Sequence, residues 1–198
     1  GVRKPTTETL NSLLFEVTNL TKLVNDLHQL SLSDRGSLTY RKDFIDINEV
    51  ILLAVASYRH TYQTKNITLL TELDDLSPLI VQADPDRLIQ LFHNLLENSV
   101  RYTYSGGQLH ISTQKGQNHV LISLEDSAPG LDSAQYEVVF QRFYRAENSR
   151  NRASGGSGLG LAICENIVEA HNGKISAMPS SLGGMKILIE LPAYSDDL

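Results

Sequence analysis

The sequence predicts an α/β two-layer sandwich, in which a mixed β-sheet is covered on one face by helices, with a separate helix at the N-terminus. From about residue 38 onward, short apolar segments typical of strands alternate with segments whose apolar residues recur every three or four positions, as in helices. Before residue 38, leucine and valine recur at steps of three and four. The chain is therefore expected to divide into residues 1–37 and a larger domain of residues 38–198.

Residues 5–34 are predicted to form one long helix. The segment 5–8 (Pro-Thr-Thr-Glu) has residues that commonly begin a helix, and Gly36 stands where a helix C-cap is expected. The apolar positions form a broad heptad seam: Leu10, Leu13, Leu14, Val17, Leu20, Leu23, Val24, Leu27 and Leu30. Its width favours a helical bundle or a dimer, and the alternative is a helix that packs only on its own domain.

The elements of the larger domain follow in order along the chain. The patterns predict strands at 38–45, 67–73, 79–83, 108–114, 119–125, 174–178 and 185–191, and helices at 48–64, from 85, and after the glycine-rich run at 155–160. Asp84 and Pro85 supply a capping carboxylate and a first-turn proline for the second of these helices. The segment 115–118 joins two strands as a hairpin.

The helix that begins at residue 85 carries a polar stripe. Asn94, Glu97, Asn98 and Arg101 share one face, because residues three, four or seven apart lie on the same side of a helix. Asparagine is unfavourable inside a helix, and a locally unfavourable choice often marks a functional site. Amide and carboxylate oxygens suit a hard divalent cation that takes its other ligands from a phosphate chain. The alternative is a solvated polar face.

A glycine-rich run at 155–160 (Gly-Gly-Ser-Gly-Leu-Gly) precedes an amphipathic helical pattern. Glycines let the backbone approach a ligand closely, and a helix start presents unpaired N–H groups to an anion. No Gly-Lys-Ser/Thr follows, and the residues before the run are polar rather than strand-like, which excludes a Walker A loop and a dinucleotide fingerprint. A flexible loop is the alternative to a phosphate-binding turn.

Several motifs, in this order, resemble the N, G1, F, G2 and last glycine boxes of bacterial sensor histidine kinases, and most closely the envelope-stress sensor kinases. They begin at Asn94, Asp126, Phe140, Gly155 and Gly183. The resemblance covers about residues 40–192. It implies the Bergerat (GHKL) ATP-binding fold, an α/β sandwich shared with type II topoisomerases, heat-shock chaperones and mismatch-repair ATPases.

The resemblance also implies roles for individual residues. Asn98 would coordinate Mg²⁺, and Asn94 would help to hold the phosphates or the water shell of the metal. Glu97 would act as general base or polarise the attacking imidazole. Arg101 would neutralise phosphate charge, and Tyr102 would pack on the adenine or the ribose.

Asp126 would accept a hydrogen bond from the exocyclic amine of adenine, a contact that selects adenine over guanine. The other residues expected to contact ATP are Gly130, Arg145, Gly156, Gly158, Leu159, Gly160 and Leu161. Two positions depart from the family pattern. Ala128 replaces a glycine and is followed by Pro129, so that close backbone approach is expected to be lost, and Met185 replaces a hydroxyl residue.

The polar segment between Phe140 and Gly155 is expected to form a mobile lid. Its arginines, of which at most two are expected to touch the nucleotide, are Arg142, Arg145, Arg150 and Arg152. Phe140 and Phe143 are expected to anchor the root of the lid on the core.

The chain has six histidines, and none lies in a motif like the His-Glu-Leu-Arg-Thr-Pro of the family. The N-terminal helix resembles the second helix of the dimerisation hairpin, so the acceptor histidine is expected upstream. His93 adjoins the polar stripe but is expected to face elsewhere. The resemblance implies a kinase that transfers the γ-phosphoryl group of Mg-ATP to that histidine, for relay to an aspartate of a response regulator. The full-length parent would be a homodimer through this helix.

Two other functions remain open: an ATP-gated clamp ATPase of the same fold, and a nucleotide-sensing module that docks a response regulator. A net charge of −6 argues against nucleic acid as a partner. Cys164 is the single cysteine, so no internal disulfide can form, and its place on an apolar face predicts burial. We expect no membrane contact by this part of the protein, which would lie in the cytoplasm, with its parent anchored in the bacterial inner membrane.

Overall fold

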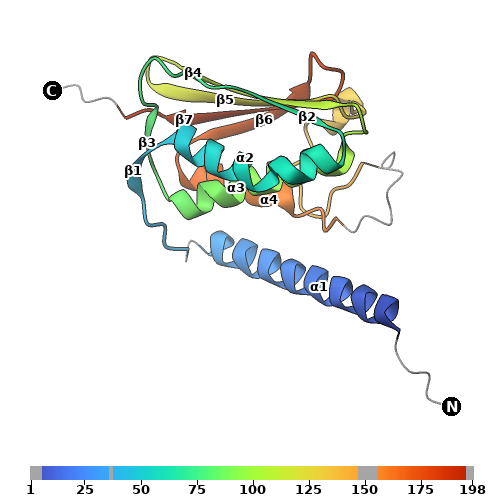
Figure 1. Cartoon of the computed structure of the whole chain (residues 1–198). Coiled ribbons are helices and arrows are strands. Elements are labelled where there is room, and N and C mark those ends of the chain that lie inside the picture. The colour runs from blue at the N-terminus through green and yellow to red at the C-terminus, as the bar shows by residue number, and fades with distance from the viewer. Residues whose placement is uncertain (1–5, 36–37, 147–155, 195–198) are drawn as a thin grey trace.

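The computed structural model of the chain describes residues 6–35, 38–146 and 156–194. A layered domain is preceded by a long helix, α1 (Thr7–Asp34), whose C-terminal end approaches the domain while its N-terminal end points away from it (Figure 1). The predicted α/β sandwich with an N-terminal helix is confirmed. In the described part of the chain, no helix has the length and apolar character needed to cross a membrane.

The main sheet has five strands in the order β2-β4-β5-β7-β6. Strand β2 (Thr68–Glu72) runs parallel to β4 (Gln108–Lys115). The other neighbours are antiparallel, and these strands are β5 (His119–Asp126), β7 (Met185–Pro192) and β6 (Lys174–Pro179). The sheet is therefore mixed, as the sequence predicts.

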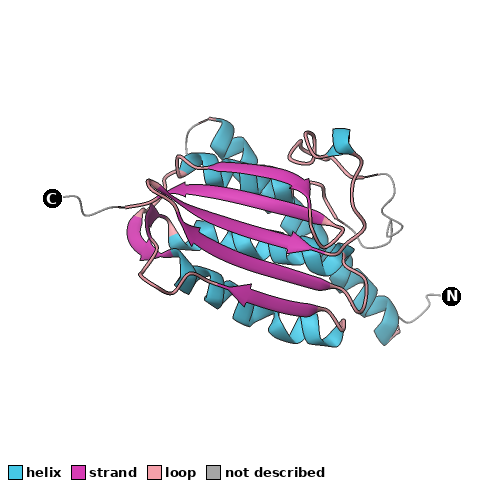
Figure 2. Cartoon of the chain, turned by 90° about the horizontal axis from the view of Figure 1, so that it is seen from above, coloured by secondary structure: helices cyan, strands magenta, loops and turns pink. Residues whose placement is uncertain are grey.

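Three helices, α2 (Ile47–Thr64), α3 (Pro85–Tyr102) and α4 (Gly160–Ala170), cover one face of this sheet (Figures 1 and 2). Helix α3 lies between the other two and packs against both. Its Leu88, Leu91 and Leu96 are fully buried, as are Ile122 of β5 and Ile189 of β7. Because these leucines hold one side of α3 in the core, the polar stripe of α3 lies at the edge of the core.

A second, small sheet pairs β1 (Asp43–Asp46) with β3 (Ile80–Ala83) in antiparallel register. The first strand is shorter than the predicted 38–45. Upstream of it, Arg41 donates its backbone N–H to Asp84 Oδ2 (2.9 Å), and Lys42 Nζ donates to the carbonyl of Ala170 (2.6 Å). The backbone N–H of Arg41 is thus bonded to a side chain and does not extend the strand.

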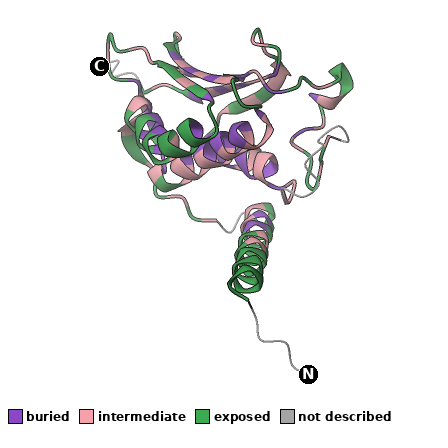
Figure 3. Cartoon of the chain, turned by 45° about the vertical axis from the view of Figure 1, so that its right-hand side comes forward, coloured by how far each residue is buried: buried purple, intermediate pink, exposed green. Residues whose placement is uncertain are grey.

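Helix α1 packs on its own domain mainly through its C-terminal half, where Asp26 and Leu30 are buried. Thr6 caps its start by accepting the N–H of Thr9 (3.2 Å), whereas Pro5 and Gly36 lie outside the described residues. Leu30 belongs to the buried core cluster, and Figure 3 shows that the buried part of α1 lies toward the end nearest the domain. Leu23 is half-buried, and the other residues of the apolar seam are 39–66% exposed: Leu10, Leu13, Leu14, Val17, Leu20, Val24 and Leu27. The predicted bundle or dimer would cover this seam and stays a prediction.

The buried carboxylate of Asp84 ties three segments of the domain together. Its Oδ1 accepts the N–H of Arg87 and caps α3 (3.2 Å), while its Oδ2 holds Arg41. The backbone N–H of Asp84 donates to Nε2 of the buried His171, at the end of α4 (2.9 Å). Asp84 therefore fixes where α3 begins relative to α4, and with it the position of the polar stripe.

We expect Asp84→Ala to lower the free energy of unfolding by about 2–3 kcal/mol, because it removes a helix cap and also the acceptor of the part-buried N–H of Arg41. Urea denaturation measures this change. The matched control is Asp86→Ala, in the exposed first turn of the same helix, which should cost only about 0.5 kcal/mol. Equal costs for the two variants would contradict the role given to Asp84.

Candidate functional site

The polar stripe of α3 opens into two adjoining cavities. One, of about 280 Å³, lies among α3, the end of β5 and the segment 128–146. The other, of about 500 Å³, lies between α3, the glycine-rich turn and α1. Six residues line both: Asn98, Arg101, Tyr102, Val139, Tyr144 and Leu161. An elongated ligand could therefore occupy both cavities at once.

The structure brings the predicted contact residues together at these cavities, with one exception. The first cavity is lined by Asp126, Gly130 and Arg145, the second by Asn94, Glu97, Gly156, Gly158 and Gly160, and both by Asn98, Arg101, Tyr102 and Leu161. Leu159 lines neither cavity, because its side chain is fully buried in the core. Its backbone N–H is bonded to Ser157 Oγ (3.3 Å).

Asp126 lies at the end of β5, at the base of the first cavity. Its Oδ1 accepts two backbone N–H groups, from Met185 (2.9 Å) and Ala128 (3.2 Å). No partner for Oδ2 is found among the described residues. Burial raises the pKa of this carboxyl, and the two backbone hydrogen bonds oppose the rise. The carboxylate is thus fixed by one oxygen, and the other is available to a hydrogen-bond donor in the cavity.

The two departures from the family pattern both contact this carboxylate through the backbone. Ala128 and Met185 donate main-chain N–H groups, which any non-proline residue supplies. A side chain is not tolerated at the neighbouring Gly184, because a Cβ there would lie 2.2 Å from Asp126 Oδ1. The backbone therefore reaches Asp126 despite the substitution at 128, and the effect of both departures on nucleotide affinity stays a prediction.

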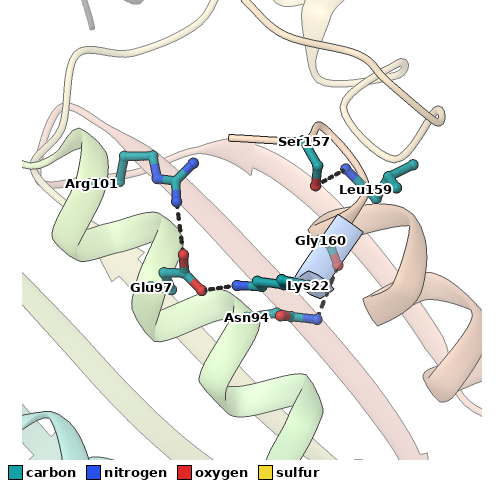
Figure 4. A network of polar contacts seen from close by, with 7 residues as sticks. All are labelled: Lys22, Asn94, Glu97, Arg101, Ser157, Leu159 and Gly160. Atoms are coloured by element: carbon teal, nitrogen blue, oxygen red, sulfur yellow. Dashed lines mark hydrogen bonds and ion pairs between the residues drawn. The ribbon is translucent and has the colours of Figure 1, made fainter. Parts of the chain in front are cut away.

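Glu97 lies between two cations at the second cavity (Figure 4). Arg101 Nη2 donates to Glu97 Oε1 (2.7 Å), and Lys22 Nζ of α1 contacts Oε2. The sequence gives no signal for Lys22, because it lies 75 residues from Glu97 in a helix whose pattern indicates a bundle. Both Lys22 and Glu97 remain partly exposed.

The glycine-rich turn leads into α4, which begins at Gly160 without a side-chain cap. Its first N–H groups are therefore available to an anion. A Cβ at Gly156 would lie 2.2 Å from Arg101 Nη1, and one at Gly158 would lie 2.8 Å from the carbonyl carbon of Phe143. Gly158 also has a positive φ of 71°. Glycine at these positions lets Arg101 and the root of the lid approach the turn.

Asn98 has an uncommitted side chain at the junction of the two cavities. No described residue bonds to its amide, whereas Asn94 Nδ2 lies 3.5 Å from the carbonyl of Gly160. No cluster of three or more histidine, cysteine or acidic residues suited to a metal occurs in the described part of the chain. Mg²⁺ needs few protein ligands when phosphate oxygens and water supply the others, so a single amide oxygen fits this ion.

Of the two aromatic residues predicted to anchor the root of the lid, one is predicted correctly and the other is not. Phe140 packs against the core, but Phe143 is 59% exposed. The backbone of Phe143 has a φ of 62°, and its N–H donates to the carbonyl of Gly158 (2.9 Å), so the backbone and not the ring makes the contact. Arg142 pairs with Asp34 of α1 (2.8 Å), away from both cavities, and Arg145 lines the first cavity. Arg150, Arg152 and the rest of segment 147–155 lie outside the described residues, so the lid stays a prediction.

His93 and Cys164 are not part of the site, in agreement with the sequence prediction. Nε2 of His93 lies 3.2 Å from Ser57 Oγ, and its ring lies 5.4 Å from that of Tyr58, so it faces α2. Cys164 is fully buried, and burial raises the pKa of its thiol. Neither residue lines a cavity of the site.

Comparison with known proteins agrees with this geometry. Residues 83–195 match the family model described as histidine kinase-, DNA gyrase B- and HSP90-like ATPase. The chain is 53% identical over 196 residues to the signal transduction histidine-protein kinase BaeS of Escherichia coli K12, covering 99% of this chain and 42% of BaeS. It is 35% identical to the sensor protein kinase WalK of Staphylococcus aureus, covering 89% of this chain and 29% of WalK.

A solved structure of the histidine kinase AdeS of Acinetobacter baumannii superposes with a TM-score of 0.81 at 25% identity, covering 98% of this chain and 89% of that one. The chain spans well under half the length of BaeS and WalK. The family match includes α3, the end of β5 and the glycine-rich turn, which carry most of the site. The chain therefore belongs to the family of histidine kinase-, DNA gyrase B- and HSP90-like ATPases, and its relatives are sensor histidine kinases.

Proposed function

We propose that this chain is the catalytic ATP-binding part of a sensor histidine kinase. It would bind Mg-ATP and transfer the γ-phosphoryl group to a histidine on a dimerisation helix that this chain lacks. The observation that carries the proposal is the joined cavity, with the buried Asp126 at one end and Glu97, Asn98 and the start of α4 at the other. This arrangement suits a base at one end and a phosphate chain at the other.

In the first cavity, the free Oδ2 of Asp126 would accept a hydrogen bond from the exocyclic amine of adenine. Guanine presents a carbonyl at that position and would leave a buried carboxylate unpaired, which is costly. Tyr102, Leu161 and Met185 line the same cavity and would contact the flat faces of the base or the ribose.

At the phosphate end, the first N–H groups of α4, together with Arg101, would bind the phosphate oxygens. Asn98 would hold Mg²⁺, which when bound neutralises charge on the phosphate oxygens. An imidazole nitrogen of the acceptor would attack the γ-phosphorus, and the bond to the β–γ bridging oxygen would break to release ADP. Glu97 would accept the proton of the imidazole or orient the ring.

The partners of the whole protein follow from this chemistry. A phosphohistidine would pass its phosphoryl group to an aspartate of a response regulator receiver domain. The exposed seam of α1 would be covered in a homodimer of the full-length parent. We also propose that the parent is anchored in the bacterial inner membrane, with this part in the cytoplasm.

Transfer of ³²P from γ-labelled Mg-ATP to a separate fragment that carries the His-Glu-Leu-Arg-Thr-Pro helix tests the proposed activity. We expect label on the histidine of that fragment, in a linkage that acid hydrolyses. Release of inorganic phosphate without labelled fragment would favour a clamp ATPase instead. Nucleotide binding with neither product would favour a nucleotide-sensing module.

Two substitutions on α3 should separate metal binding from transfer. We expect Asn98→Ala to abolish Mg-dependent nucleotide binding, a loss of more than about tenfold in affinity. Glu97→Ala should leave the affinity within about twofold but lower the transfer rate by about 10²-fold or more, because a general base acts on the chemical step. Calorimetry and the transfer assay measure the two effects. The same loss of binding in both variants would contradict this division of roles.

The adenine contact is tested by Asp126→Asn. We expect the affinity for ATP to fall by about tenfold, since a hydrogen bond to a charged acceptor is lost, while the affinity for a base-free triphosphate changes little. Competition binding with both ligands measures the difference. If the two ligands weaken equally, the substitution has disturbed the cavity as a whole and the adenine assignment is wrong.

A further inference from the structure

We propose that Lys22 of α1 is a positioning residue that controls the availability of the Glu97 carboxylate. While Lys22 is paired with Glu97, its ammonium blocks the approach of the acceptor imidazole to the carboxylate. This inference rests on the proposed function, because it concerns the regulation of the same site. It assigns to the N-terminal helix a direct restraint on the transfer step.

The contacts of Glu97 carry the inference (Figure 4). Its Oε1 is bonded to Arg101, a residue of the same helix, and its Oε2 is contacted by Lys22. Lys22 and Glu97 line the same 500 Å³ cavity. The ammonium therefore occupies space that an imidazole would need to reach Oε2.

Anchored contacts hold Lys22 in this place. Further along α1, Gln29 Oε1 accepts from Gln90 Nε2 of α3 (2.7 Å), and Leu30 is buried against the domain. Near the C-terminal end of α1, Asp34 pairs with Arg142. Because these contacts fix the position of α1, they keep the backbone of Lys22 within reach of Glu97.

The surroundings of the pair indicate a weak restraint. The side chains of Lys22 and Glu97 are 48% and 33% exposed, so water screens their attraction. Asp26, one turn further along α1, is largely buried. Burial raises the pKa of its carboxyl, and the nearby charge of Lys22 lowers it in part. An ion pair screened in this way can slow transfer by a few-fold, and not by orders of magnitude.

Three chains should be compared in the transfer assay with the histidine-bearing fragment: wild type, Lys22→Met and Lys22→Arg. At saturating Mg-ATP and fragment, we expect Lys22→Met to raise kcat by about two- to fivefold, the range expected from the loss of an exposed ion pair. Its Kd for Mg-ATP, measured by calorimetry, should stay within about twofold of wild type. Lys22→Arg keeps the cation and should return the wild-type rate.

The matched control is Asp34→Asn, which removes the ion pair with Arg142 and leaves Lys22 in place. The inference requires a larger rise in kcat for Lys22→Met than for this control. An equal rise in both variants would assign the effect to release of the helix, and the inference would then be wrong. An unchanged or lower kcat for Lys22→Met would also overturn the inference. Weaker Mg-ATP binding in Lys22→Met would overturn it too, by making Lys22 a nucleotide ligand. If the wild-type chain transfers no label, the proposed function itself is wrong. This outcome differs from those that overturn only the role of Lys22.

Discussion

Burial of one face of α3 fixes the position of the polar stripe on which the site is built. Leucines on that face pack on the sheet and on the neighbouring helices, so the helix cannot rotate without exposing them to water. The same constraint turns Asn94, Glu97 and Asn98 toward the cavity beside the glycine-rich turn, and it places Tyr102 near the end of β5. Asp84 sets where α3 begins and couples it to α4. The site is thus a consequence of how one amphipathic helix is held in the core.

Features with a local physical cause could be predicted from the sequence. The cap at Asp84 and the hairpin that follows α3 depend on residues adjacent in the chain, and the structure has both. The polar stripe of α3 could also be recognised, because helical periodicity alone puts its residues on one face. The glycines at 156 and 158 signalled close backbone approach, although not which groups approach.

Features that depend on distant partners could not be predicted. The first strand is short because Arg41 bonds to Asp84, 43 residues away. Phe143 looked like a core anchor by its type, but a left-handed backbone turns its ring to solvent. Lys22 carried no signal, because its contact with Glu97 exists only when α1 docks on the domain. In each case a contact between distant residues overrides the local pattern. The pattern assigns α1 to a bundle, but α1 also takes part in the site.

The central claim is that one adenine nucleotide with its magnesium spans the joined cavities. Calorimetric titration of the 198-residue chain with ATP in the presence and absence of Mg²⁺, and with GTP for comparison, tests it most directly. The account predicts one ATP bound per chain, tighter binding with Mg²⁺ than without it, and much weaker binding of GTP. The absence of any binding heat and of any competition by ATP at saturating concentration, or equal affinity for ATP and GTP, would contradict it.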